Sequence, residues 1–287
     1  MRVRRRSSGD VLFEETWRCP PATFCGLLMT SRSTGAATCY YCGRPATSAE
    51  HVPPRCIFPE RKDAFGVDRR KNLITVPSCD EHNLRKSKED EFLMACITPV
   101  VGTNGTGFVQ TQTKLRRAIS RSGGRLLDIS VRNTKPASLV VNDGIRLPIL
   151  MGTVDMPRLC RALEHVARGL FFHRKGSHFV GKCHVIPGFV QFPDGSGLQV
   201  INRLTRLMVM QEQTDWDVHG ENEDVFQYRV GPTDQYGLIP MAMTFFRGVN
   251  VYVAFQPDGV KPPHRTLNEA SPDDPLRIDL FVGEGGP

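Results

Sequence analysis

The sequence has no long hydrophobic run and no internal repeat of useful period. No window of the 287 residues contains the roughly 18 uninterrupted apolar residues that a membrane helix needs, and the longest apolar runs are only strand-length. A chain of this length can bury a sizeable core and commonly forms one or two domains. We therefore expect a cytoplasmic protein without a membrane segment.

Acidic residues are fewer than basic ones, since 30 Asp and Glu against 37 Lys and Arg give a net charge of +7 and a pI near 9.0. This excess favours an anionic partner such as nucleic acid, because clustered Lys and Arg gain affinity by releasing phosphate counterions. Part of it lies in the run from Arg2 to Arg6, which can equally be a solvated tail. No aromatic signature of the kind that stacks single-stranded RNA bases stands out, so the residues do not mark RNA as the target.

The chain has neither a secretory signal peptide nor the format of a small disulfide-rich protein, and its nine cysteines are an odd number. These features favour a reduced compartment in which some cysteines bind metal. Three cysteines have ligand spacing, namely Cys39, Cys42 and Cys79. The other six are scattered, and we expect them to be small buried side chains or free thiols.

Composition divides the chain into four expected segments, and the mixture of predicted helices and strands makes the fold class α+β. Either Met1 or Met29 could be the start, because the organised sequence begins about ten residues after Met29. The segments are a poorly ordered basic tail (1–37), a metal-binding module (38–97), a mixed α+β domain that could bind substrate (98–275) and a C-terminal tail (276–287).

Periodicity predicts the elements of the second domain. Asp155 is expected to cap a helix whose apolar residues recur every three or four positions. A basic helix is predicted over residues 109–122. Four further basic residues lie between 168 and 182, and together with the helix they form either a phosphate-binding surface or a solvated cationic face. Strands are predicted at residues 126–131, 139–141, 145–150, 179–192, 204–211, 225–230, 241–246, 249–255 and 276–282.

The strongest pattern is a pair of two-residue ligand spacings. Cys39 and Cys42 form one pair, and Cys79 and His82 form the other. Two such pairs can surround Zn²⁺ tetrahedrally, with thiolate sulfur at about 2.3 Å and imidazole nitrogen at about 2.0 Å. Because protein atoms would fill all four positions, the site is predicted to be structural rather than catalytic.

A second set of polar residues lies among these ligands. Glu50 and His51 stand at the end of a predicted strand, and prolines forbid a helix in the loop that follows. A short strand is predicted at residues 72–76 and a helix at residues 81–95. Taken alone, an acid-His pair is a weak signal that often marks a surface pair or a hydrogen-bonded histidine.

Taken together, these residues resemble the HNH endonuclease family, whose ββα-metal motif consists of two strands and a helix around one divalent ion. The resemblance covers about 55 residues and lies in Glu50-His51-Val-Pro-Pro, in Asn72-Leu and in Cys79-x-x-His-Asn-x-x-Lys86, which follow in the family's order. The pattern is similar to a subgroup of uncharacterised bacterial HNH proteins. It implies a ββα-metal module with a structural zinc ion.

The resemblance also implies a role for each residue. His51 is the general base, and Glu50 and Asn83 hold a catalytic divalent ion. Asn72 ties the hairpin and helps to orient His51. Two positions depart from the usual pattern: Glu50 replaces the more frequent Asp, and His82 replaces the usual fourth cysteine, which should weaken zinc binding modestly.

General chemistry is compatible with these roles. A free imidazole has a pKa of about 6.5, so His51 would be largely neutral near pH 7 and able to take a proton from water. One carboxylate and one amide oxygen with open positions suit Mg²⁺ or Mn²⁺. Lys86 or its neighbour Arg85 could add a positive contact to a phosphate.

The expected function is therefore that of a metal-dependent HNH endonuclease that hydrolyses phosphodiester bonds, with DNA as the favoured substrate. The family implies products with a 5′ phosphate and a 3′ hydroxyl. The alternative is a zinc-containing nucleic-acid-binding module without catalysis, which would have no need for Glu50, His51 and Asn83 together. No protein partner is indicated.

Overall fold

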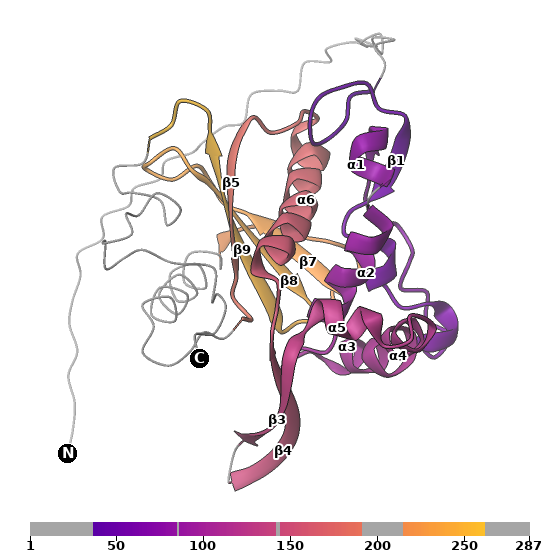
Figure 1. The fold of residues 1–287 in the computed structure, drawn as a ribbon. Helices are drawn as coiled ribbons and strands as arrows, with labels where there is room; N and C mark the ends of the chain where they lie inside the picture. The colour runs from indigo at the N-terminus through magenta and orange to yellow at the C-terminus, as the bar shows by residue number, and fades with distance from the viewer. Residues whose placement is uncertain (1–36, 85, 142–143, 191–214, 262–287) are drawn as a thin grey trace, which may run out of the picture. The chain divides into compact units, whose positions relative to one another are not determined.

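The computed structural model describes residues 37–84, 86–141, 144–190 and 215–261. Within these ranges the chain is α+β, with three antiparallel sheets and several helices (Figure 1), as predicted. The elements in chain order are β1 (Ser48–His51), two 3-10 turns (Arg55–Ile57 and Arg61–Asp63), β2 (Thr75–Ser78), α1 (Asp80–Leu84), α2 (Lys86–Ile97), α3 (Gly105–Gln110), a π-helical turn (Thr111–Leu115), α4 (Arg116–Arg121), α5 (Arg125–Ser130), β3 (Arg132–Val141), β4 (Ile145–Thr153), α6 (Met156–Lys175), β5 (Gly181–Pro187), β6 (Val218–His219), β7 (Phe226–Val230), β8 (Ile239–Phe245) and β9 (Val249–Pro257).

The first sheet is the short antiparallel hairpin β1–β2, which leads directly into α1. Its register places Ser48 opposite Ser78 and His51 opposite Thr75. The strand predicted at residues 72–76 begins later, at Thr75, because Asn72 adopts a left-handed backbone conformation (φ 54°) that a strand does not accommodate. The 81–95 helix is present as α1 and α2.

The helical stretch from α3 to α5 corrects one prediction. The basic helix predicted at 109–122 is the later part of a continuous run that starts at α3, but the strand predicted at 126–131 is the helix α5. Gly124 turns the chain in the left-handed region (φ 86°), and the hydroxyl of Ser122 accepts from the amide of Leu126 at 3.0 Å. Leu126 and Ser130 are the buried residues of α5, and their spacing of four is helical.

The predicted helix after Asp155 is confirmed as α6. The Asp155 carboxylate accepts from the amide of Arg158 at 3.0 Å, and Gly176 ends the helix with a left-handed backbone (φ 73°). Its predicted apolar stripe, which includes Leu159 and Leu163, is buried. No helix in the described ranges is long and apolar enough to cross a membrane.

The remaining strands form two sheets. The predictions at 139–141 and 145–150 are confirmed as the hairpin β3–β4. The largest sheet has the antiparallel order β5-β9-β8-β7-β6, and it contains the strands predicted at 179–192, 225–230, 241–246 and 249–255, the first in a shorter form. The strands predicted at 204–211 and 276–282 lie outside the described residues.

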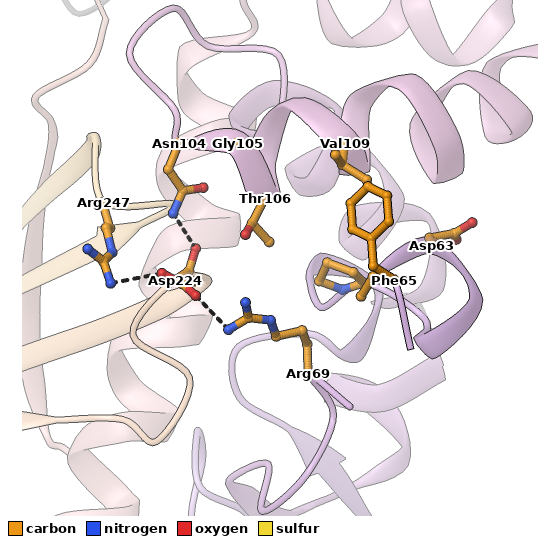
Figure 2. A pocket seen from close by; sticks show the side chains of 11 residues that line it. Asp63, Phe65, Arg69, Asn104, Gly105, Thr106, Val109, Asp224 and Arg247 are labelled. Atoms are coloured by element: carbon orange, nitrogen blue, oxygen red, sulfur yellow. Dashed lines mark hydrogen bonds and ion pairs between the residues drawn. The ribbon is translucent and has the colours of Figure 1, made fainter. Parts of the chain in front are cut away.

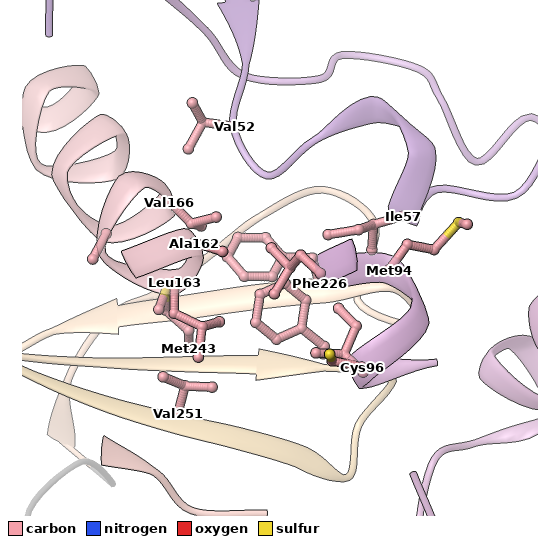
Figure 3. Close-up of a cluster of buried hydrophobic side chains, with 14 of the residues drawn as sticks. Val52, Ile57, Met94, Cys96, Ala162, Leu163, Val166, Phe226, Met243 and Val251 are labelled. Carbon is pink, nitrogen blue, oxygen red and sulfur yellow. The ribbon is translucent and has the colours of Figure 1, made fainter. Parts of the chain in front are cut away.

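One hydrophobic core joins the metal-binding segment to the large sheet. Val52 and Ile57 from the loop after β1 belong to the same buried cluster as Leu163 of α6 and Phe226 and Met243 of the sheet (Figure 3). The expected domain boundary between residues 97 and 98 lies within the part of the chain that contributes to this core. The position of the β1–β2 hairpin is therefore set by packing against α6 as well as by local hydrogen bonds.

Candidate functional site

The four predicted ligands come together from two turns. Cys39 and Cys42 lie in the turn before β1, where Gly43 has a left-handed backbone (φ 72°) and its amide donates to the Cys39 carbonyl at 3.0 Å. Cys79 lies between β2 and α1, and the amide of His82, in the first turn of α1, donates to the Cys79 carbonyl at 3.1 Å. One ligand atom from each residue lies within 4.8 Å of the other three.

The spacing of these atoms fits a tetrahedral metal site. A tetrahedron with zinc-like bond lengths has edges of about 3.8 Å between two sulfurs and about 3.5 Å between sulfur and nitrogen. Sγ of Cys42 and Sγ of Cys79 are 3.8 Å apart, and Nδ1 of His82 lies 3.7 Å from Sγ of Cys39 and 3.2 Å from Sγ of Cys79. The cluster can therefore hold a metal ion, and its donor set is compatible with structural zinc.

The surroundings of Cys42 and His82 favour the protonation states that metal binding needs, whereas burial raises the pKa of the Cys79 thiol. Burial alone would raise the pKa of the Cys42 thiol, but hydrogen bonds from the side chain and backbone of Arg44 outweigh it and lower that pKa. The Arg44 guanidinium lies 3.4 Å from Sγ of Cys42 and also pairs with Glu81. Burial lowers the pKa of His82, which favours the neutral imidazole.

The metal cluster is linked to α6 through aromatic side chains that the sequence did not single out. The ring of Tyr41 stacks on His82, with centroids 4.5 Å apart, and on His165 of α6 at 4.4 Å. The hydroxyl of the neighbouring Tyr40 lies 2.9 Å from Nδ1 of His165. No periodicity marks such contacts, because they join residues about 125 positions apart along the chain.

Glu50 and His51 are the last residues of β1. Glu50 is only 6% exposed, whereas His51 is half-buried. Burial lowers the pKa of His51, with Arg55 and Arg70 adding to the effect, while the Ile74 carbonyl opposes it. Nδ1 of His51 is sealed from solvent and makes no hydrogen bond with any described residue. The lowered pKa keeps the imidazole neutral, as a base must be.

Asn83 is held against the β1–β2 hairpin. Its side-chain nitrogen donates to the hydroxyl of Ser48 at 2.8 Å. Ser48 and Glu50 are two residues apart in β1, so their side chains leave the same face of the strand. The structure therefore places the Asn83 amide beside the strand face that carries Glu50, with its nitrogen hydrogen-bonded to Ser48.

The other two predicted catalytic residues are placed differently. Asn72 lies just before β2, and its side-chain nitrogen donates to the carboxylate of Glu221, in the turn between β6 and β7. None of its hydrogen bonds goes to His51, so the predicted orienting role has no direct contact to support it. Lys86 begins α2, but its side chain, like all of Arg85, lies outside the described residues.

Comparison of the chain with protein-family models, curated proteins and solved structures finds no match.

Two cavities lie near the candidate site without being lined by Glu50, His51 or Asn83. One, of about 350 Å³, lies between α2 and α6 and includes His82 and His165 in its wall. The other, of about 320 Å³, lies between the β1–β2 loop, α3 and the turns at the ends of β7 and β8 (Figure 2).

Two of the other cysteines, and one basic residue of the candidate phosphate-binding surface, have structural environments. Burial raises the pKa of the Cys56 thiol to about 12 and that of Cys160 to about 11, so neither resembles a thiolate ligand. Arg168, expected as part of a basic surface, is 8% exposed and donates to the carbonyls of Phe179 and Gly181 at 3.0 and 2.9 Å. It ties α6 to the segment before β5 and is therefore not available to a phosphate.

Proposed function

We propose that this chain is a metal-dependent HNH-type endonuclease that hydrolyses phosphodiester bonds, most readily in DNA. The observation that carries the proposal is the hydrogen bond between Asn83 and Ser48. It brings the last residue of the motif to the strand that carries Glu50 and His51, in the order strand, strand, helix. A binding module has no use for a buried carboxylate and a neutral histidine at this junction.

The Cys39, Cys42, Cys79 and His82 cluster would hold a structural Zn²⁺. Three thiols and one imidazole match the closed donor sets of structural zinc sites, in which no position is left for water or substrate. The four ligands flank the hairpin, so a metal ion there would fix the end of β2 relative to the turn before β1. His82 and Asn83 are consecutive, so the same helix start would serve both sites.

Glu50 and Asn83 would hold a hard divalent cation, because carboxylate and amide oxygens are the donors that Mg²⁺ and Mn²⁺ prefer. When bound, such an ion stabilises negative charge on the phosphate and on the departing oxygen. His51 would take the proton of the attacking water, whose oxygen forms the new bond to phosphorus while the bond to the 3′ oxygen breaks. The products would carry a 5′ phosphate and a 3′ hydroxyl.

The direct test is cleavage of supercoiled plasmid, linear duplex, single-stranded DNA and RNA with Mg²⁺, with Mn²⁺ and with chelator. We expect metal-dependent cutting of DNA by the parent and its loss in His51→Ala, with zinc content unchanged. His173→Ala is the matched control, because His173 is an exposed histidine at the end of α6. If His51→Ala cuts as fast as the parent, the assignment of the base is wrong.

The second candidate function is a zinc-containing nucleic-acid-binding module without catalysis. It is favoured by the net charge of +7 and by the four basic residues, with no acidic one, in the stretch from α3 to α4. The same experiment separates the two: nucleic-acid binding without cutting in any metal, and without an effect of His51→Ala, would identify the binding module.

A further inference from the structure

Phe65 occupies an unusual position in the loop between β1 and β2. Its side chain is 90% exposed, and its backbone lies in the left-handed region (φ 51°), which bulky residues rarely adopt. Gly66 follows with φ 85°, so the chain makes a sharp turn that projects the ring outward. An exposed aromatic ring on a disfavoured backbone contributes little to folding, which points to a use in binding.

The loop that carries Phe65 is held in place from several sides. Nε of Arg61 donates to the carbonyl of Gly66 at 2.9 Å, across the base of the turn. The Asp63 carboxylate accepts two hydrogen bonds from the Arg117 guanidinium of α4, at 3.0 and 2.6 Å. The backbone on both sides of Phe65 is therefore held by side-chain contacts, which lowers the cost of ordering the loop on binding.

Phe65 forms one wall of the cavity of about 320 Å³. Figure 2 shows Phe65 and Val109 at one side of this cavity and Asp224 and Arg247 at the other. Asp224 pairs with Arg69 at 2.7 Å and with Arg247 at 2.8 Å. The cavity is thus preformed, with an apolar side facing a polar one, and its size is at the lower end for small-ligand sites.

The polar wall is also fastened to α3. The side-chain nitrogen of Asn104 donates to the carbonyl of Asp224 at 2.8 Å, and its backbone amide donates to the carbonyl of Phe246 at 2.9 Å. The Asn104 side-chain oxygen accepts from the amide of Gly107 at 3.0 Å and caps the helix. The backbone of Asp224, whose carboxylate pairs with Arg69 and Arg247, is consequently held against α3.

The loop and helix sides of the cavity are basic, whereas the polar wall carries Glu223 and Asp224, which both pair with Arg247. Residues 55–72 contain six basic and three acidic residues, and the α3–α4 stretch adds four basic residues and no acidic one. The acidic side chains at the cavity itself, Asp63 and Asp224, are both engaged by arginines. A nucleobase combines a flat apolar face with a polar edge and is attached to a phosphate chain, which matches this arrangement.

We propose that this cavity holds an unstacked base of the nucleic-acid substrate, with Phe65 as the stacking platform and the arginine side facing the base edge. The proposal rests on the proposed function, because the loop starts immediately after His51 and would bind the strand that the nuclease site cuts. It adds a preference for distorted or unpaired DNA that the catalytic residues alone would not give.

The test is binding of the full chain to three probes of equal length, measured by fluorescence anisotropy without added Mg²⁺ or Mn²⁺ and without chelator, so that the structural metal stays bound. The probes are a single strand, a duplex with one unpaired 2-aminopurine and a fully paired duplex. We expect Phe65→Ala to weaken binding of the first two about 5- to 100-fold and of the paired duplex less than twofold. The 2-aminopurine emission should change with the parent and not with Phe65→Ala.

Two controls isolate the ring. Phe65→Trp should retain the preference, because an indole also stacks on a base. Phe108→Ala removes another exposed phenylalanine, 61% exposed on α3 and outside the cavity wall, and should leave all three affinities unchanged. Equal binding by Phe65→Ala and the parent, or an equal loss on all three probes, overturns the base-binding proposal.

The same measurements separate this proposal from the nuclease proposal. A parent that cuts DNA, combined with a Phe65→Ala variant that binds like the parent, overturns only the base-binding site. A parent that prefers the unpaired probe through Phe65 but never cuts overturns only the nuclease. A parent that binds none of the probes and cuts no DNA with Mg²⁺ or Mn²⁺ overturns both.

Discussion

The hydroxyl of Tyr40, in the turn that supplies two metal ligands, lies 2.9 Å from Nδ1 of His165 in the middle of α6. Tyr40 is fully buried, and its neighbour Tyr41 stacks between His165 and the ligand His82. The metal cluster is therefore joined to the helix that covers the large sheet. A substitution that perturbs α6 near His165 should therefore also perturb the metal cluster, and the reverse.

Tyr40→Phe removes this hydrogen bond with little change in volume. We expect the free energy of unfolding to fall by about 1 kcal/mol, the usual net value of one buried hydrogen bond, with metal content unchanged. A double-mutant cycle with His165→Ala, measured by denaturant unfolding, should give a coupling energy of about 0.5–1.5 kcal/mol. Additive effects of the two substitutions would show that the contact does not contribute.

Cys42→Ser should abolish metal binding and lower the melting temperature, because the oxygen of serine is a poor replacement for a thiolate at a closed site. Metal content by plasma emission spectroscopy and thermal unfolding with and without chelator provide the measurement. Cys160→Ala is the matched control, because Cys160 is a cysteine of α6 outside the cluster. Full metal occupancy in Cys42→Ser would contradict the site.

Ser48→Ala should weaken binding of the proposed catalytic ion, although it changes none of the proposed ligands. The substitution removes the acceptor that holds the Asn83 amide, so the Mg²⁺ concentration for half-maximal cleavage should rise about tenfold or more. Structural metal content should stay constant. Ser120→Ala, at an exposed position of α4, is the control and should behave like the parent. An unchanged Mg²⁺ dependence would argue against Asn83 as a ligand.

Gly169→Ala tests the packing of α6 on the residue after His51. Alanine favours helix by about 1 kcal/mol, but a Cβ at this position would lie 2.7 Å from Cγ2 of the buried Val52. We expect a net destabilisation of about 1–3 kcal/mol in denaturant unfolding, together with slower cleavage.

Two further variants complete that experiment. Adding Val52→Ala should recover part of the loss caused by Gly169→Ala, because it removes the methyl groups that the new Cβ meets. Gly105→Ala, where an added Cβ meets nothing within 4 Å, should be neutral or stabilising. A Gly169→Ala variant more stable than the parent would show that the contact relaxes without cost.

The Asp63–Arg117 pair should make stability depend on pH. Hydrogen bonds from the Arg117 guanidinium lower the pKa of Asp63, although burial opposes the shift. Because the pKa of Asp63 is lower in the folded state, its charged form stabilises the fold. This contribution to the free energy of unfolding is complete above the ordinary aspartate pKa of about 3.9 and is lost as the pH falls through the lowered pKa.

Asp63→Asn therefore provides the comparison. At pH 7 it should be less stable than the parent by about 1 kcal/mol or less, because Arg117 is well exposed, and the difference should shrink towards zero as the pH falls through the lowered pKa of Asp63. Thermal unfolding of both proteins across this range measures it. A difference in stability between the parent and Asp63→Asn that grows as the pH falls would contradict a stabilising Asp63–Arg117 pair.

The parts of the fold that the sequence predicted are those specified by local signals. Asp155, the apolar stripe of α6 and Gly176 act within a turn or two of the helix, so capping and periodicity are enough. The ligand spacings were likewise readable, because Cys39 and Cys42, like Cys79 and His82, each lie within one turn.

The failures have physical causes of two kinds. The run at 126–131 is apolar enough for a strand, but the Gly124 turn and the Ser122 hydroxyl start a helix there, and periodicity over six residues cannot tell the two apart. The contacts of Asn72 with Glu221 and of Tyr40 with His165 depend on how distant segments pack, which no local pattern encodes.

The positions of the four ligands also have a consequence for the unfolded chain. A metal ion bound by both Cys42 and Cys79 closes a loop of the chain that contains Glu50, His51 and Phe65. In the chain-entropy description, a cross-link around a ring of this size removes conformational freedom from the unfolded state worth about 4 kcal/mol. A metal ion at this site would therefore also restrict the proposed catalytic and base-binding residues in the unfolded chain.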